Sequence, residues 1–96
     1  MHAVVRNYSG PGAKELFDLL DEHKSEVESL LRTVPGLVSY TMLHTDGGGA
    51  TVTVCQDKAG TDESVRVARE WIQENASGVG ASPPSISEGS VIVSLK

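Results

Sequence analysis

The chain has 96 residues, of which 39% are hydrophobic and 22% charged, and its formal net charge is −5. This length predicts a single domain over residues 1–96, and the composition is typical of a globular protein. The eight Lys and Arg residues are scattered along the sequence, whereas nucleic-acid binding requires clustered cations. Nucleic acid is therefore excluded as a partner.

No apolar run approaches the roughly 20 residues that span a bilayer. The N-terminal MHAVVRNYSG lacks the apolar core and cleavage site of a signal peptide. The single cysteine allows no internal disulfide, which agrees with a reducing compartment. We therefore expect a cytoplasmic protein without a membrane partner.

The first half of the chain predicts a strand, a long helix and a second strand. Residues 2–8, HAVVRNY, are β-branched and aromatic enough for a strand, and SGPG follows as a turn. From 13 to 34, apolar residues recur at three- and four-residue steps, which predicts one amphipathic helix that Pro35 ends. Residues 37–45, LVSYTMLHT, predict the second strand.

A glycine-rich hairpin follows, in which DGGG joins residues 37–45 to a third strand over 50–57, ATVTVCQD. The loop length decides which side chains share a face of the sheet. An odd loop places Val54 beside Met42, whereas an even loop places Thr53 there. We favour the odd loop because it groups the valines with Met42, with one glycine in the left-handed conformation.

The second half predicts another helix and a closing strand. Thr61 is a good N-cap, and residues 62–76, DESVRVAREWIQENA, carry apolar residues at helical spacing. Pro83 and Pro84 forbid a helix in the loop that follows. Residues 90–95, SVIVSL, predict the fourth strand.

This order of elements predicts an α+β ferredoxin-like βαββαβ sandwich, an antiparallel four-stranded sheet with two helices on one face. The first and fourth strands carry apolar residues on both faces, although the helices cover only one. A second copy related by twofold symmetry is the simplest cover for the other face. We therefore expect a homodimer through the open sheet face.

The glycines, the cysteine and the histidines have structural explanations. A phosphate-binding loop requires a helix directly after its glycines, but a strand is predicted after DGGG; SGPGAK has Glu15 where a dinucleotide-binding fingerprint needs glycine. Cys55 has no CxxC partner and is expected in the core. His2, His23 and His44 stand in separate elements without ligand spacing, so neither a metal site nor a cofactor is predicted.

Four residues are candidates for a site. Arg6 lies in a predicted central strand, where it either forms a structural ion pair, or takes a rim position, or recognises an acidic or phenolic ligand. Asn7 projects to the opposite face, so only one of the two can line a given cavity. His44, near a strand end, is either an edge histidine or an acid–base group. Trp71 packs between helix and sheet or lines a pocket beneath the helices.

The length, the element order, VPGLVSY leading into the second strand and the terminal PPSISEGSVIV resemble the dimeric α/β-barrel superfamily, which includes antibiotic-biosynthesis-monooxygenase-like proteins. The resemblance implies a homodimer whose sheets face each other, with a ligand pocket between helices and sheet in each subunit. Its cofactor-free oxygenases hold a phenolic substrate with Asn, Trp, Tyr and Arg side chains. Asn7, Trp71, Tyr40 and Arg6 are of these types. Haem-degrading members use a helical histidine to ligate iron, and residues 62–76 contain none.

The resemblance therefore implies a small-molecule-binding protein with cofactor-independent monooxygenase-like activity on a small aromatic or polyketide-like substrate. In this interpretation Arg6 or His44 orients or deprotonates the phenol, and Asn7, Tyr40 and Trp71 contact the ligand. The alternatives are a non-catalytic ligand-binding homodimer and a structural homodimer with both faces packed and no cavity.

Overall fold

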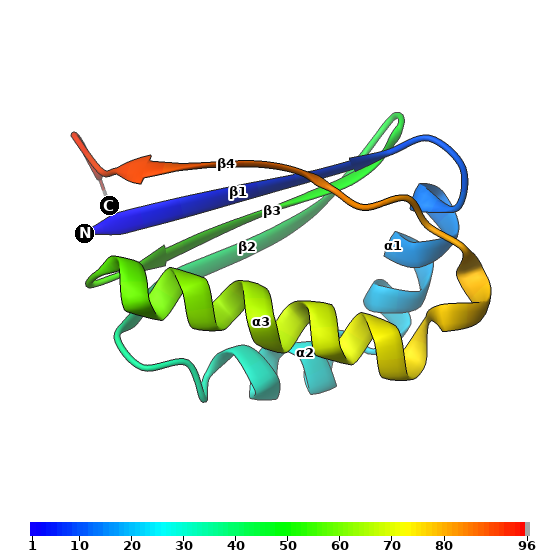
Figure 1. Ribbon diagram of the computed structural model, residues 1–96, viewed down its shortest axis with the longest axis horizontal. Coiled ribbons are helices and arrows are strands. Elements are labelled where there is room, and N and C mark those ends of the chain that lie inside the picture. Colours follow the sequence, from blue (N-terminus) through cyan, green and yellow to red (C-terminus); the bar gives the residue numbers. More distant parts are fainter. Residues whose placement is uncertain (96) are drawn as a thin grey trace.

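The computed structural model describes residues 1–95 and consists of one four-stranded antiparallel sheet with the helices on one face (Figure 1). In chain order its elements are β1 (His2–Ser9), α1 (Ala13–Glu22), α2 (Lys24–Leu31), β2 (Leu37–Thr45), β3 (Gly48–Cys55), α3 (Lys58–Asn75), a 3-10 turn (Ser77–Val79) and β4 (Ser85–Ser90). The order across the sheet is β2-β3-β1-β4, so β1 is central. The predicted ferredoxin-like α+β fold is confirmed. Within residues 1–95, no helix combines the length and the apolar character that a membrane span needs.

The single helix predicted over 13–34 is divided into α1 and α2. The backbone of His23 leaves the helical region, with φ −107° and ψ 23°, and this ends the first helix. Residues 21–26 are all polar and exposed, so no apolar side chain anchors a continuous helix through this point. Both shorter helices bury apolar residues against the sheet, such as Leu20 in α1 and Val27 in α2.

The register of the hairpin between β2 and β3 shows that the favoured odd loop is wrong. Only two residues separate the strands, and two-residue connections are the commonest in hairpins. Thr51 lies opposite Met42, and Thr53 lies opposite Tyr40. This register places the threonines of β3 on the helix-covered face and its valines on the open face.

Two of the three hairpin glycines lie inside β3, where they allow α1 to approach the sheet. A Cβ atom on Gly49 would overlap the ring of Phe17, and one on Gly48 would crowd Ala13. The glycine run is therefore explained as much by helix packing as by the turn.

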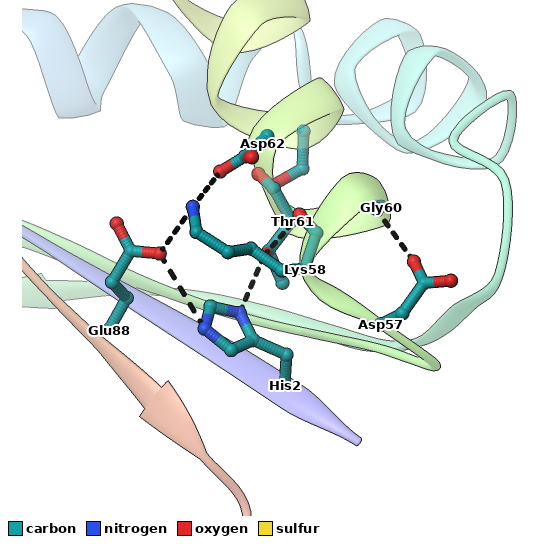
Figure 2. Close-up of polar contacts among 8 residues, drawn as sticks. His2, Asp57, Lys58, Gly60, Thr61, Asp62 and Glu88 are labelled. Carbon is teal, nitrogen blue, oxygen red and sulfur yellow. Dashed lines mark hydrogen bonds and ion pairs between the residues drawn. The ribbon is translucent and has the colours of Figure 1, made fainter.

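Helix α3 begins at Lys58, four residues before the predicted start, and Asp57 rather than Thr61 is its N-cap. The Asp57 carboxylate accepts a hydrogen bond from the backbone N–H of Gly60 at 3.1 Å. Thr61 lies within the first turn of the helix and is only 1% exposed. Its hydroxyl is directed toward the sheet, where it meets His2 of β1 (Figure 2).

The fourth strand lies at Ser85–Ser90 and not at 90–95, so the prediction for SVIVSL is wrong. Ser90 is already paired with His2, so almost no length of β1 remains for the following residues to pair with. Val91 still donates its N–H to the carbonyl of Met1 at 3.0 Å. Beyond it lies an uncovered apolar segment: Ile92, Val93 and Leu95 are 95%, 72% and 90% exposed.

The core fills the space between the helices and the covered face of the sheet. Its largest fully buried side chains include Phe17, Leu16 and Leu31. The rings of Phe17 and Tyr8 are 5.4 Å apart and tilted, a favourable aromatic arrangement. Cys55 is completely buried in this core, as predicted.

The opposite face of the sheet has no cover within residues 1–95. Val5 lies on it opposite Val52 of β3, and Leu43 of β2 lies opposite Ala50. Val5 and Leu43 are 38% and 42% exposed, whereas Val4, on the covered face, is 1% exposed. Apolar side chains thus lie on both faces of β1, as the sequence predicted.

Candidate functional site

A pocket of about 310 Å³ opens between α3 and the β1–β4 side of the sheet. Arg6, Tyr8 and Ile72 contribute to its wall, and residues 81–84 and Ile86 close it on the side of β4. In Figure 1 residues 81–84 belong to the segment that climbs from the end of α3 to β4, and Ile86 lies in β4 itself. The volume is at the lower end of the range for sites that enclose small molecules, about 300–1,000 Å³. We call this space the Arg6 pocket.

Arg6 is the least conventional side chain of this pocket. It is only 3% exposed, and its Nη1 donates a hydrogen bond to the Tyr8 hydroxyl at 2.9 Å. Its Nε is buried without any acceptor, and no carboxylate of residues 1–95 forms an ion pair with the guanidinium. A buried cation normally has an anionic or carbonyl partner, because desolvation of an unpaired charge is costly. Arg6 is therefore a buried cation whose hydrogen bonding the described residues leave incomplete.

A second, smaller cavity of about 20 Å³ adjoins the Arg6 pocket, since Arg6, Tyr8 and Ile72 line both. Tyr40 and Trp71 lie on its wall. This volume suits one water molecule and is too small for an aromatic ring system. Arg6, Tyr40 and Trp71 are thus brought together, but only Arg6 also lines the larger pocket.

The polar groups around the small cavity are held by different means. The indole N–H of Trp71 donates to Glu26 at 3.0 Å, which ties α3 to α2. Burial raises the pKa of the Tyr40 phenol, while the nearby Arg6 cation acts in the opposite direction. The Tyr40 phenol is therefore neutral at pH 7. The hydroxyl of Thr51 on the same wall is buried without a partner.

His44 and Asn7 lie outside both cavities. The His44 side chain is 53% exposed, and its Nε2 is 3.2 Å from the Asp21 carboxylate. This hydrogen bond, together with Lys24, lowers the pKa of Asp21. Asn7 is exposed on the open face of the sheet, opposite Ala50. The proposed roles of His44 and Asn7 stay predictions.

Arg69 is a pocket residue that the sequence analysis did not single out. It lies on α3 and lines the Arg6 pocket beside Val65 and Ile72. The three residues follow the helical spacing i, i+4 and i+7, so they share one stripe of the helix. The signal available in the sequence was an arginine between two apolar residues on the same stripe of the helix.

A polar cluster at the start of α3 has the residue types of a catalytic relay. His2 Nδ1 is 2.7 Å from the Thr61 hydroxyl, and His2 Nε2 is 3.5 Å from Glu88 (Figure 2). Lys58 Nζ bridges Glu88 and Asp62 at 3.2 and 2.8 Å. Thr61, however, is almost fully buried, and its hydroxyl donates to the Lys58 carbonyl at 3.0 Å. The cluster therefore joins α3, β1 and β4 structurally and presents no accessible nucleophile.

Two further chemistries find no support among the described residues. The Cys55 thiol is fully buried, and burial, with Asp57, raises its pKa, so it does not supply a reactive thiolate. Residues 1–95 contain no group of three or more His, Cys, Asp or Glu side chains that could hold a metal ion. The Arg6 pocket is therefore the site for which this chain offers the most chemistry.

No model of a protein family matches this sequence, and no curated protein matches it. Solved structures do match it in fold. NE2512, a protein of unknown function from Nitrosomonas europaea, has a TM-score of 0.71 and 18% identity over 99% of this chain and 91% of that chain. SnoaB, a cofactor-independent oxygenase from Streptomyces nogalater, has a TM-score of 0.66 and 16% identity over 98% and 95%. A dimeric ferredoxin-like protein from an uncultured marine organism has a TM-score of 0.62 and 16% identity over 99% and 95%.

These likenesses define the class of fold. The chain has the ferredoxin-like α+β fold that a dimeric ferredoxin-like protein and a cofactor-independent oxygenase also adopt, so the predicted resemblance is confirmed at the level of the fold. Nearly the whole of each chain takes part in the match. At 16–18% identity the match concerns the fold and not the activity.

Proposed function

We propose that this protein binds a small aromatic or polyketide-like molecule in the Arg6 pocket and oxygenates it without a cofactor. The observation that carries the proposal is that Arg6, whose Nε is buried without an acceptor, lines a pocket large enough for a ligand. A phenolic or carbonyl oxygen would complete the hydrogen bonding of this guanidinium. The fold that the chain shares with a cofactor-independent oxygenase agrees with this function.

The chemistry follows from the charge of Arg6. A cation next to a bound phenol lowers the pKa of that phenol and favours the phenolate. The phenol proton passes to water at the open side of the pocket, and the electron-rich phenolate transfers one electron to dioxygen. The ligand radical and superoxide combine at a ring carbon that still bears hydrogen and form a hydroperoxide, which loses water to leave the carbonyl of a quinone. The substrate thus supplies all the electrons, one oxygen atom enters the product and the other leaves as water. The Tyr40 phenol, whose pKa burial raises, stays protonated, so it does not neutralise the charge of Arg6. Trp71 lines the small cavity that adjoins the Arg6 pocket.

We propose further that the protein acts as a homodimer through the open sheet face. Val5 and Leu43 are exposed there, and Ile92, Val93 and Leu95 form an exposed apolar segment beyond β4. Burial of apolar area contributes about 25 cal/mol per Å², so a second copy that covers this face would stabilise both. Light scattering should report a dimer for the wild type and a monomer for V5D. The variant T33D, at an exposed position outside the sheet, should remain a dimer; a monomeric wild type would contradict the proposal.

The test of activity combines binding with oxygen consumption. A panel of hydroxynaphthalenes and anthrones would be titrated under nitrogen by calorimetry and then exposed to labelled dioxygen, with the product identified by mass spectrometry. We expect binding, oxygen uptake above the enzyme-free background and incorporation of the label, all lost in R6Q. Binding without oxygen uptake would instead support the non-catalytic alternative. Absence of binding across the panel would contradict the site itself.

A further inference from the structure

The charges on the wall of the Arg6 pocket are opposite to those of the whole chain. The sequence has 13 Asp and Glu against 8 Lys and Arg. The pocket nevertheless includes Arg6 and Arg69 among its lining residues and no carboxylate. A cavity that collects cations in an acidic protein favours an anion as its occupant.

Both pocket arginines also lack carboxylate partners. Among the cations of residues 1–95, those that form ion pairs with Asp or Glu side chains are Lys24, Arg32, Lys58 and Arg66. Arg66, one turn from Arg69 on the same helix, contacts both Glu63 and Glu70 at 2.7 Å. Arg6, Lys14 and Arg69 form no such pair, and two of these three line the same pocket. Helix α3 therefore neutralises the arginine that faces away from the pocket and leaves the other free.

The two arginines lie at different depths. Arg6 is 3% exposed, whereas Arg69 is exposed at the mouth. The wall also includes apolar side chains, among them Val65, Ile72 and Pro83. A matching ligand has an oxygen acceptor at its inner end, an apolar body and an anionic group at its outer end.

We infer that the molecule bound here is an aromatic carboxylic acid, and that Arg69 binds its carboxylate at the mouth while Arg6 binds its phenolic or carbonyl oxygen inside. Arginine presents paired N–H donors that match the two oxygens of a carboxylate. This inference rests on the proposed function, since it assigns the substrate class of the same site. It makes Arg69 a specificity-determining residue, which separates acids from neutral molecules of the same shape.

The test compares two probes of nearly the same shape, the anionic 6-hydroxy-2-naphthoate and the neutral 6-hydroxy-2-naphthamide. Dissociation constants would be measured by calorimetry under nitrogen, so that oxidation does not interfere. We expect the wild type to bind the acid about three- to fivefold more tightly than the amide, the upper part of the range for an exposed ion pair. The R69Q variant should lose this preference with little change in its affinity for the amide. The matched control R66Q, on the same helix but outside the pocket, should keep the preference.

The outcomes separate the inference from the function on which it rests. Equal affinity of the wild type for acid and amide, or an equal loss of both in R69Q, would overturn the carboxylate assignment and leave the pocket intact. Failure of the wild type to bind either probe, or binding that R6Q leaves unchanged, would overturn the proposed function together with the inference. If high salt weakens binding of the acid but not of the amide, the inference gains support, because salt screens an exposed ion pair.

Discussion

Replacement of Arg6 by methionine should make the ligand-free protein more stable while it removes ligand binding. The guanidinium is buried without a carboxylate, and substitution of buried charges by apolar groups of similar volume is often stabilising, here by about 2 kcal/mol. Against this, the Tyr8 hydroxyl loses its 2.9 Å partner, which costs about 1 kcal/mol. The net expectation for R6M is that the free energy of unfolding increases by about 1 kcal/mol, which corresponds to a rise of roughly 4–8 °C in Tm.

A double-mutant cycle with Tyr8 checks the reasoning. Y8F alone should lower stability by about 1–2 kcal/mol, because Arg6 Nη1 then also lacks an acceptor. R6M/Y8F removes both partners, and its free energy of unfolding should exceed that of R6M by about 1 kcal/mol. Stability would be measured by urea unfolding at one fixed protein concentration, since dimer formation makes it concentration-dependent. R66M, at an exposed position, should change stability by less than about 0.5 kcal/mol. If R6M is destabilised by more than about 1 kcal/mol, Arg6 is satisfied in the folded protein and its free donor is no evidence for a ligand.

Three further predictions concern the scaffold. G49A should lose about 1–3 kcal/mol in urea unfolding, because its Cβ would overlap the Phe17 ring, whereas G89A, with open space around it, should be near neutral; equal effects would contradict the packing argument. D57A should lose about 1 kcal/mol through the missing helix cap, and D57S should restore most of it; an unchanged D57A would show that the cap is not required. Because burial raises the pKa of Tyr40, the free energy of unfolding should fall as the pH rises above about 10, the pKa of an unfolded tyrosine; Y40F should flatten this fall, and a Y40F profile that matches the wild type would contradict it.

The order of the elements was accessible to sequence reasoning, because helical and strand periodicities differ and each apolar stripe must be buried. The strand positions were harder. SVIVSL alternates better than SISEGS, yet the second forms β4, because the length of β1 decides where its neighbour ends. Pairing is a property of two segments and is not visible in either alone.

The length of the hairpin loop between β2 and β3 and the position of the pocket were not predicted, for related reasons. Threonine and valine have nearly the same shape, so the pattern of Thr51 and Val52 in β3 fits either face when both faces are to be covered. Arg6 was identified because a charge in a central strand is unusual. Arg69 was not, because the opposite wall of its pocket is formed by residues 81–84, a loop whose path no periodicity predicts.

The position of Trp71 gives the molecule its own spectroscopic reporter. It is the only tryptophan, and it is 8% exposed. Its indole lies where α2 meets α3: the indole N–H is hydrogen-bonded to Glu26, and the ring is edge-on to the His23 ring, with the ring centroids 5.8 Å apart. Its emission should therefore be that of an indole shielded from water in the folded protein and should shift to the red when α2 separates from α3. Local opening of the helical layer can thus be followed by fluorescence without a label, and independently of far-ultraviolet dichroism, which reports on the backbone of the whole chain.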